Sequence, residues 1–111
     1  MKTLLIDDRR TLSLANATAR SFKTGVNKLK RQKWDLLLLD HDLGEFEKTG
    51  YDVMVWLKDN KEFQPKMILC ISNNPPGRDR INLMIKDIYG RVFDSRDIDA
   101  LKDAEERKEK V

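Results

Sequence analysis

Carboxylates stand at the ends of two apolar segments of this 111-residue chain. Asp7 and Asp8 directly follow the run Thr3–Ile6, and Asp40 closes the four leucines at positions 36–39. Mg²⁺ takes hard oxygen ligands of this kind in proteins, often together with water and a phosphate group. These residue types therefore indicate divalent-metal chemistry on a phosphate, with Asp40 as the residue most expected to react.

The apolar runs before these acids are typical of strands in the middle of a parallel sheet. Four consecutive leucines carry no helical period and are too short to cross a membrane. A continuous apolar run of this length suits a strand that is buried on both faces. In open α/β sheets ligands bind in the crevice outside the carboxyl ends of the strands. Asp40 stands at such an end.

The rest of the chain alternates between strand and helix patterns, which indicates a single α/β domain over residues 1–111 with a three-layer architecture. Its parallel sheet is expected to carry helices on both faces. The predicted strands are Thr3–Ile6, Ala17–Phe22, the leucine run 36–39, Met67–Ile71 and Arg91–Phe93. The predicted helices are Thr24–Gln32, Tyr51–Asn60, Arg78–Tyr89 and Asp97–Lys108. Arg9–Asn16 is an irregular stretch too short for a full helix, and Gly44–Gly50 is a polar loop. The chain is expected to end in a frayed charged tail, Glu105–Val111.

Composition narrows the class of protein. The chain is 40% hydrophobic and clearly periodic, which argues against disorder. Its net charge of +3 is more typical of a solvated surface than of extended nucleic-acid binding. No apolar run approaches the length of a membrane span, so we expect no membrane partner. A single cysteine and the absence of a signal-peptide pattern predict a cytoplasmic protein.

Right-handed crossovers bring the carboxyl ends of parallel strands to one edge of the sheet. The two leading acids, Asp40 and the pair Ser72-Asn73 should therefore converge there. Ser72, Asn73 and Arg91 could donate hydrogen bonds to phosphate oxygens. Arg78 opens a helix, and helix N-termini attract anions. We therefore expect a phosphate beside the carboxylates.

His41 and Asp42 add two further candidates directly after Asp40. An imidazole titrates near neutral pH and could serve as a general acid or base. Asp42 could be a further metal ligand if its side chain turns toward the other acids. Each candidate has a simpler structural alternative. Asp7 or Asp8 could cap a turn, and His41 could be a surface histidine. Ser72 and Asn73 could cap the following loop, and Arg91 could form a plain salt bridge.

The order of these residues resembles the response-regulator receiver domain. Receivers have paired acids after the first strand, an aspartate ending the central strand, a hydroxyl residue after the next strand, and a lysine before Pro-Phe. Their acids hold Mg²⁺, the central aspartate takes up a phosphoryl group, and the hydroxyl and the lysine contact it. The resemblance assigns these roles in turn to Asp7 and Asp8, Asp40, Ser72 and Arg91.

Three departures separate this chain from the usual receiver pattern. The first helix is shortened or missing, Arg91-Val92 replaces Lys-Pro, and Asp40 is followed by His-Asp-Leu-Gly. A stand-alone receiver-like domain with this sequence is similar to the group described as cyclic-phosphate-processing receiver domains. The resemblance implies metal-dependent processing of a cyclic phosphate on a nucleotide or an RNA end. Catalysis would fall to Asp40 and His41, and Mg²⁺ or Mn²⁺ would be held by Asp7, Asp8, Asp40 and Asp42.

Two other functions stay open at this point. The chain could be a signalling receiver that is phosphorylated on Asp40 and binds a protein partner through its Tyr89–Phe93 face. It could also be a module that binds a phosphate ligand without turnover. Only the processing of a cyclic phosphate would make the protein an enzyme, as a metal-dependent phosphodiesterase or cyclic phosphate hydrolase.

Overall fold

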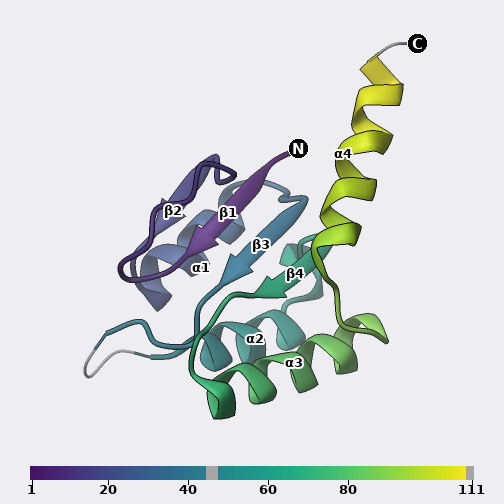
Figure 1. The fold of residues 1–111 in the computed structure, drawn as a ribbon. Coiled ribbons are helices and arrows are strands. Elements are labelled where there is room, and N and C mark those ends of the chain that lie inside the picture. The colour runs from purple at the N-terminus through teal and green to yellow at the C-terminus, as the bar shows by residue number, and fades with distance from the viewer. Residues whose placement is uncertain (45–47, 110–111) are drawn as a thin grey trace.

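A computed structural model describes residues 1–44 and 48–109 of the chain (Figure 1). Four parallel strands form one sheet in the order β2-β1-β3-β4. The strands are β1 (Thr3–Ile6), β2 (Ala17–Ala19), β3 (Leu36–Leu39) and β4 (Met67–Cys70). The helices are α1 (Phe22–Arg31), α2 (Gly50–Asp59), α3 (Pro75–Tyr89) and α4 (Ser95–Glu109), with a 3₁₀ turn at Lys61–Phe63. The predicted parallel α/β architecture is confirmed.

The two central strands are buried along their whole length, as their apolar runs predict. Every residue of β1 and β3 is buried, and the register places Leu5 beside Leu38 and Leu38 beside Leu69. Strands covered on both faces need no alternation of polar and apolar residues. The four leucines of β3 are therefore explained by its place between β1 and β4.

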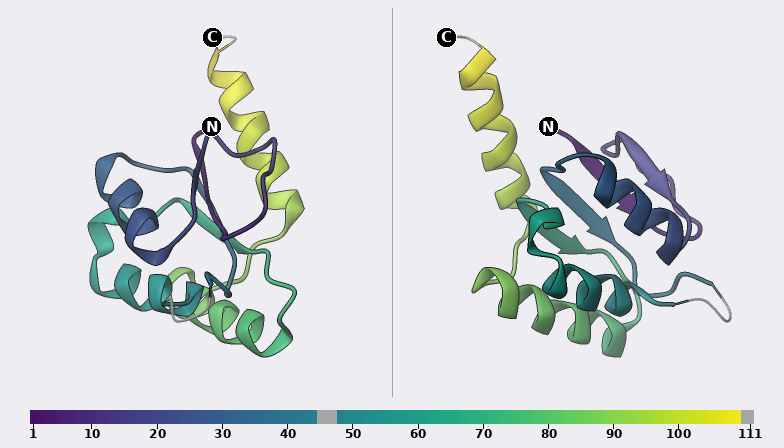
Figure 2. Two further views of the ribbon diagram at one scale, coloured as in Figure 1. Left: turned by 90° about the vertical axis from the view of Figure 1, so that its left-hand side faces the viewer. Right: turned by 180° about the vertical axis from the view of Figure 1, so that it is seen from behind.

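Helices cover the two faces of the sheet unequally. Helices α1, α2 and α3 pack on one face of the sheet (Figure 2). On that face Leu29, Leu57 and Ile81 join the inward side chains of the strands. On the other face Ile98 of α4 joins Leu5, and the loop between β1 and β2 contributes further apolar groups. The C-terminal part of α4 extends past the sheet (Figure 1). The expectation of helices on both faces holds, with only the first turns of α4 on the second face.

Several element boundaries differ from the sequence prediction for local reasons. β2 ends at Ala19 because Ser21 caps α1, with its Oγ accepting the Thr24 N–H at 3.2 Å. α3 begins at Pro75 because proline is tolerated at the first helical position, where the N–H is unpaired in any helix. The stretch from residue 7 to residue 16 contains no helix, as predicted.

The predicted fifth strand at Arg91–Phe93 is wrong. Gly90 ends α3 in the left-handed conformation, with φ of 79°. The hydroxyl of Tyr89 donates to the carbonyl of Pro65, which precedes β4, at 2.6 Å. Residues 91–93 therefore connect α3 to α4 at the amino edge of the sheet and are not part of it.

Two predicted segments extend beyond the described residues. The predicted polar loop Gly44–Gly50 includes residues 45–47, which lie outside them, and α2 already begins at Gly50. The predicted frayed tail Glu105–Val111 is helical through Glu109, and residues 110 and 111 lie outside the described range. None of the helices in residues 1–44 and 48–109 is long and apolar enough to cross a membrane.

Candidate functional site

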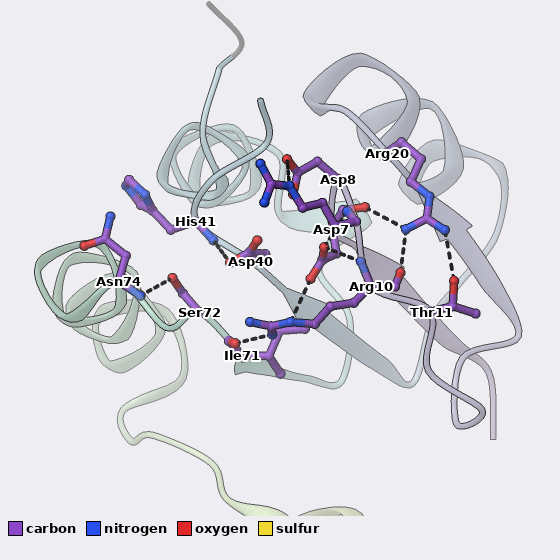
Figure 3. A network of polar contacts seen from close by, with 11 residues as sticks. Asp7, Asp8, Arg10, Thr11, Arg20, Asp40, His41, Ile71, Ser72 and Asn74 are labelled. Atoms are coloured by element: carbon purple, nitrogen blue, oxygen red, sulfur yellow. Dashed lines mark hydrogen bonds and ion pairs between the residues drawn. The ribbon is translucent and has the colours of Figure 1, made fainter. Parts of the chain in front are cut away.

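Three carboxylates meet at the carboxyl edge of the sheet. Asp7 and Asp8 follow β1 and Asp40 follows β3, and one oxygen of each lies within 4.8 Å of the others. The sheet ladder extends one residue past the strands, since the Asp7 N–H donates to Ala19 and the Asp40 N–H to Ile6, both at 3.0 Å. The backbone of the two buried acids is therefore held by the sheet itself. Figure 3 shows their side chains turned toward one another.

Asp7 is almost completely buried, with 1% of its surface exposed. Its Oδ1 accepts the backbone N–H groups of Arg9 and Arg10, each at 2.8 Å. Its Oδ2 is buried and has no hydrogen-bond donor among the described residues. The Nε of Arg10 lies 3.7 Å from this oxygen, an ion pair beyond hydrogen-bond distance. A buried carboxylate oxygen without a hydrogen bond costs free energy. A cation at this position would remove that cost.

Asp40 is also buried, and its Oδ1 accepts the N–H of His41 at 2.9 Å. Burial raises the pKa of Asp40, and the negative charge of Asp7 raises it further. The His41 N–H and the charge of Arg10 lower that pKa in part. Three close acids, one of them with a buried oxygen that accepts no hydrogen bond from the described residues, fit a hard divalent cation such as Mg²⁺ or Mn²⁺. The donor set that Asp7, Asp8 and Asp40 provide thus suits the expected metal.

A cleft of about 630 Å³ opens over the carboxylates. This volume lies in the range of small-molecule sites. Its walls mix acidic, basic and amide side chains, which can contact a charged polar ligand. They are formed by Asp7, Asp8, Arg9, Arg10, Asp40, Asp42, Asn73 and Asn74.

The polar residues after β4 divide into caps and free groups. Ser72 is buried, and its Oγ accepts the Asn74 N–H at 3.1 Å, while Asn74 Oδ1 accepts the Gly77 N–H and caps α3. The structure therefore supports the capping alternative for Ser72, and Asn74 rather than Asn73 caps α3. Asn73 is exposed and lines the cleft, where its amide can reach a ligand. The Ser72 bond uses an oxygen lone pair and leaves the hydroxyl hydrogen free to donate.

The imidazole of His41 is not brought into the carboxylate cluster. Its ring lies against the start of α3, where a Cβ on Gly77 would stand only 2.4 Å from His41 Cγ. Figure 3 shows the ring pointing away from Asp7 and Asp8. Its Nδ1 lies 3.1 Å from Asp42 Oδ1. Because Gly77 has no side chain, the ring of His41 has room to pack against α3. This geometry does not favour the expected role of His41 as general acid.

Asp42 lines the cleft but lies outside the group of three close carboxylates. Its side chain is 63% exposed, and its Oδ2 lies 3.5 Å from Asn74 Nδ2. Contacts with His41 and Asn74 therefore hold it at the rim. The expectation that Asp42 is a ligand of the same metal is not supported by this arrangement.

Neither of the two arginines expected to bind phosphate lies in the cleft. Arg91 makes a two-bond pair with Asp97, at 2.9 and 3.0 Å, at the opposite edge of the sheet. The expectation that Arg91 contacts the phosphate is wrong, because residues 91–93 do not form the fifth strand that would have placed it at the carboxyl edge. Arg78 is exposed in the first turns of α3 and is not among the residues of the cleft wall.

Arg10 is a site residue that the sequence reasoning missed. Its Nη1 donates to the carbonyl of Ile71, just after β4, and its Nε lies 3.7 Å from Asp7 Oδ2. A signal was present, since Arg10 stands two positions after the paired acids in a stretch too short for a helix. A side chain in such a stretch must stay near the carboxyl edge.

The comparisons with known proteins give one match. The family model of the cyclic-phosphate processing receiver domain matches residues 2–87. This range contains all three clustered acids, Arg10 and the residues that follow β4. No curated protein and no solved structure matches the chain.

Proposed function

Because the chain belongs to the cyclic-phosphate processing receiver domain family, we propose that it hydrolyses a cyclic phosphate on a nucleotide or an RNA end with the help of a divalent metal. The observation that supports the metal most directly is the buried Oδ2 of Asp7, which has no donor in the described part of the chain. Asp7, Asp8 and Asp40 would hold Mg²⁺ or Mn²⁺. A metal in such a site neutralises phosphate charge and lowers the pKa of a bound water.

In the proposed reaction water adds to phosphorus and one ring P–O bond breaks. The proton that the water loses ends on the oxygen that leaves, so the product is an open phosphate monoester. The protein's own groups then have two tasks, which are to orient the phosphate and to hold the acids in place. Asn73 can donate to a phosphate oxygen from the cleft wall. Backbone N–H groups fix Asp7 and Asp40 from one side and leave the other oxygen of each toward the cleft.

Excess Mg²⁺ or Mn²⁺ should raise the melting temperature of the wild-type protein. A ligand that binds only the folded state stabilises it by about 2.7 kcal/mol at 100 times its Kd. Relief of the repulsion among the three acids contributes to the affinity for the metal and is therefore already part of this stabilisation. Thermal melts by circular dichroism, in chelator and across a metal titration, measure the effect. A melting temperature in excess Mg²⁺ and in excess Mn²⁺ that equals the value in chelator would contradict the proposed metal site.

His41→Ala should lower activity on 2′,3′-cyclic mononucleotides by less than about tenfold. A general acid or base typically contributes about 10²–10⁴-fold, but the imidazole lies against Gly77 and contacts Asp42. We therefore assign His41 a packing role against the start of α3. The measurement is product formation from cyclic mononucleotides and from an RNA with a cyclic phosphate end, in Mg²⁺ or Mn²⁺. A loss of 10²-fold or more, with metal binding intact, would restore the catalytic role of His41.

The same assay decides between turnover and the two alternatives. A wild-type protein that is inactive on all of these substrates would contradict the proposed function. A signalling receiver would instead take up a phosphoryl group from acetyl phosphate as a mass increase that Asp40→Asn abolishes. Its proposed partner face is partly occupied within the protein, since Tyr89 and Phe93 pack edge to face at 5.3 Å. Ligand binding without either reaction would indicate the binding module.

A further inference from the structure

Arg10 reaches from the loop between β1 and β2 across the cleft floor to the end of β4. Its guanidinium donates to the Ile71 carbonyl, and its Nε forms an ion pair with Asp7 Oδ2 at 3.7 Å. Arg10 lines the same cleft as Asn73. Its side chain is 33% exposed, so part of it faces the space where a ligand would lie. The guanidinium thus borders both the acids and the open volume.

The backbone that carries Arg10 is held from two directions. Asp7 Oδ1 accepts the N–H of Arg10, and Arg20 donates through Nη1 to the carbonyls of Asp7 and Arg10. Arg20 Nη2 also donates to the Thr11 hydroxyl at 3.1 Å. Figure 3 shows this chain of contacts along the loop. Because this loop is already held in place, binding of a ligand to Arg10 should cost little conformational entropy.

The other basic groups near or expected near the site are less suited to bind a phosphate over the acids. Arg9 lines the cleft, but its side chain is 89% exposed. Arg78 stands outside the cleft wall, and Arg91 is paired with Asp97 at the far edge. A guanidinium has five N–H donors, and Ile71 uses one of those of Arg10. Its Nε faces Asp7 Oδ2, and the remaining Nη donors can bind phosphate oxygens in pairs.

We propose that Arg10 is the phosphate-binding cation of this site and takes the role that the sequence assigned to Arg91. This inference rests on the proposed function, because it concerns the phosphate of the same substrate. Arg10 acts by binding and orienting that phosphate against the acids. A purely structural counter-ion to Asp7 would affect the stability of the fold and leave phosphate affinity unchanged, so the two roles can be separated.

The test is calorimetric titration of inorganic phosphate into the full chain in excess Mg²⁺. Hydrogen bonds to charged groups contribute about 1.5–3 kcal/mol, so Arg10→Ala should weaken phosphate binding by roughly 10–150-fold. Arg10→Lys keeps the charge without the fork and should fall between wild type and Arg10→Ala. Arg91→Ala is the matched control and should bind phosphate within about twofold of wild type. Circular dichroism melts report whether each variant is folded.

Three results would overturn the inference. The first is a folded Arg10→Ala variant that binds phosphate as tightly as wild type. The second is a loss of phosphate affinity in Arg91→Ala equal to that in Arg10→Ala, and the third is a wild-type protein that binds no phosphate. If Arg10→Ala does not fold, Arg10→Lys decides, and unchanged affinity in that variant also counts against the inference. Titration of phosphate requires no turnover. A protein that loses phosphate binding with Arg10→Ala but hydrolyses no cyclic substrate would therefore contradict the proposed function and leave the role of Arg10 intact.

Discussion

Asp40→Asn is expected to melt at a higher temperature than wild type in chelator and to lose both the response to metal and the turnover. In the absence of metal, burial and the charge of Asp7 raise the pKa of Asp40, so its ionised form destabilises the folded state. Asparagine keeps the shape and removes the charge. The same change removes a ligand of the proposed metal, and loss of one electrostatic group at a reacting centre commonly costs about 10²–10³-fold in rate.

The direction of the pH dependence follows from the raised pKa. In wild type the stabilising contribution of protonated Asp40 is complete below the unfolded value of about 3.9. It is lost as the pH rises through the higher pKa of the folded state. Asp40→Asn lacks this contribution to the pH dependence. Its stability advantage in chelator should therefore be present at neutral pH and disappear in acid.

Asp42→Asn is the matched control for this experiment. It makes the same chemical change at the rim of the same cleft, outside the three close carboxylates. We expect it to keep the rise in melting temperature with Mg²⁺ or Mn²⁺ and most of the activity on cyclic mononucleotides. The measurements are melts in chelator and in metal at several pH values, together with product formation. Retained metal response in Asp40→Asn, or its complete loss in Asp42→Asn, would refute the ligand set proposed here.

Gly50→Ala is expected to destabilise the protein by about 1–3 kcal/mol or more. Gly50 is the first residue of α2, and its N–H donates to the His41 carbonyl at 2.8 Å. A Cβ at Gly50 would lie 2.0 Å from the backbone oxygen of Asp40 and 3.1 Å from Ile81 Cδ1. Because the first contact is with backbone, relief requires a shift of α2 or of the chain around Asp40. Metal response should weaken together with stability.

Gly25→Ala tests whether the effect belongs to that backbone contact. Gly25 is also a buried glycine in an early turn of a helix, but its Cβ would meet side-chain atoms of Ile6, the closest at 2.6 Å. A side chain can adjust more cheaply than a backbone, and alanine favours the helix by up to about 1 kcal/mol. We expect Gly25→Ala to destabilise the protein less than Gly50→Ala does. Denaturant unfolding measures both variants, and equal stability of Gly50→Ala and wild type would contradict the argument.

The sequence alone determined the two central strands of the sheet and the edge at which the three acids lie. The apolar runs of β1 and β3 are long enough to require burial on both faces, and each ends on a carboxylate. In a parallel sheet the carboxyl ends share one edge, so Asp7, Asp8 and Asp40 had to meet once the topology was right. Local pattern was sufficient here because burial and periodicity are properties of neighbouring residues.

Tertiary structure decided the rest of the site, beginning with its cation. Arg10 finds its partner in the carbonyl of Ile71, 61 residues away. Whether residues 91–93 would pair with β4 also depended on distant geometry, since three residues after a helix carry too little pattern to choose. Arg91 consequently lies with Asp97 at the other edge.

The direction of His41 depended on a contact with a separate element. Because His41 directly follows Asp40 at the end of β3, its backbone lies at the carboxyl edge of the sheet. Its ring, however, occupies the space that Gly77 leaves open at the start of α3. A side chain after a strand end can turn to either side of the crevice, and packing against a segment distant in sequence selects one. Residue order sets where a group enters the site, while the packed neighbours set which way it points.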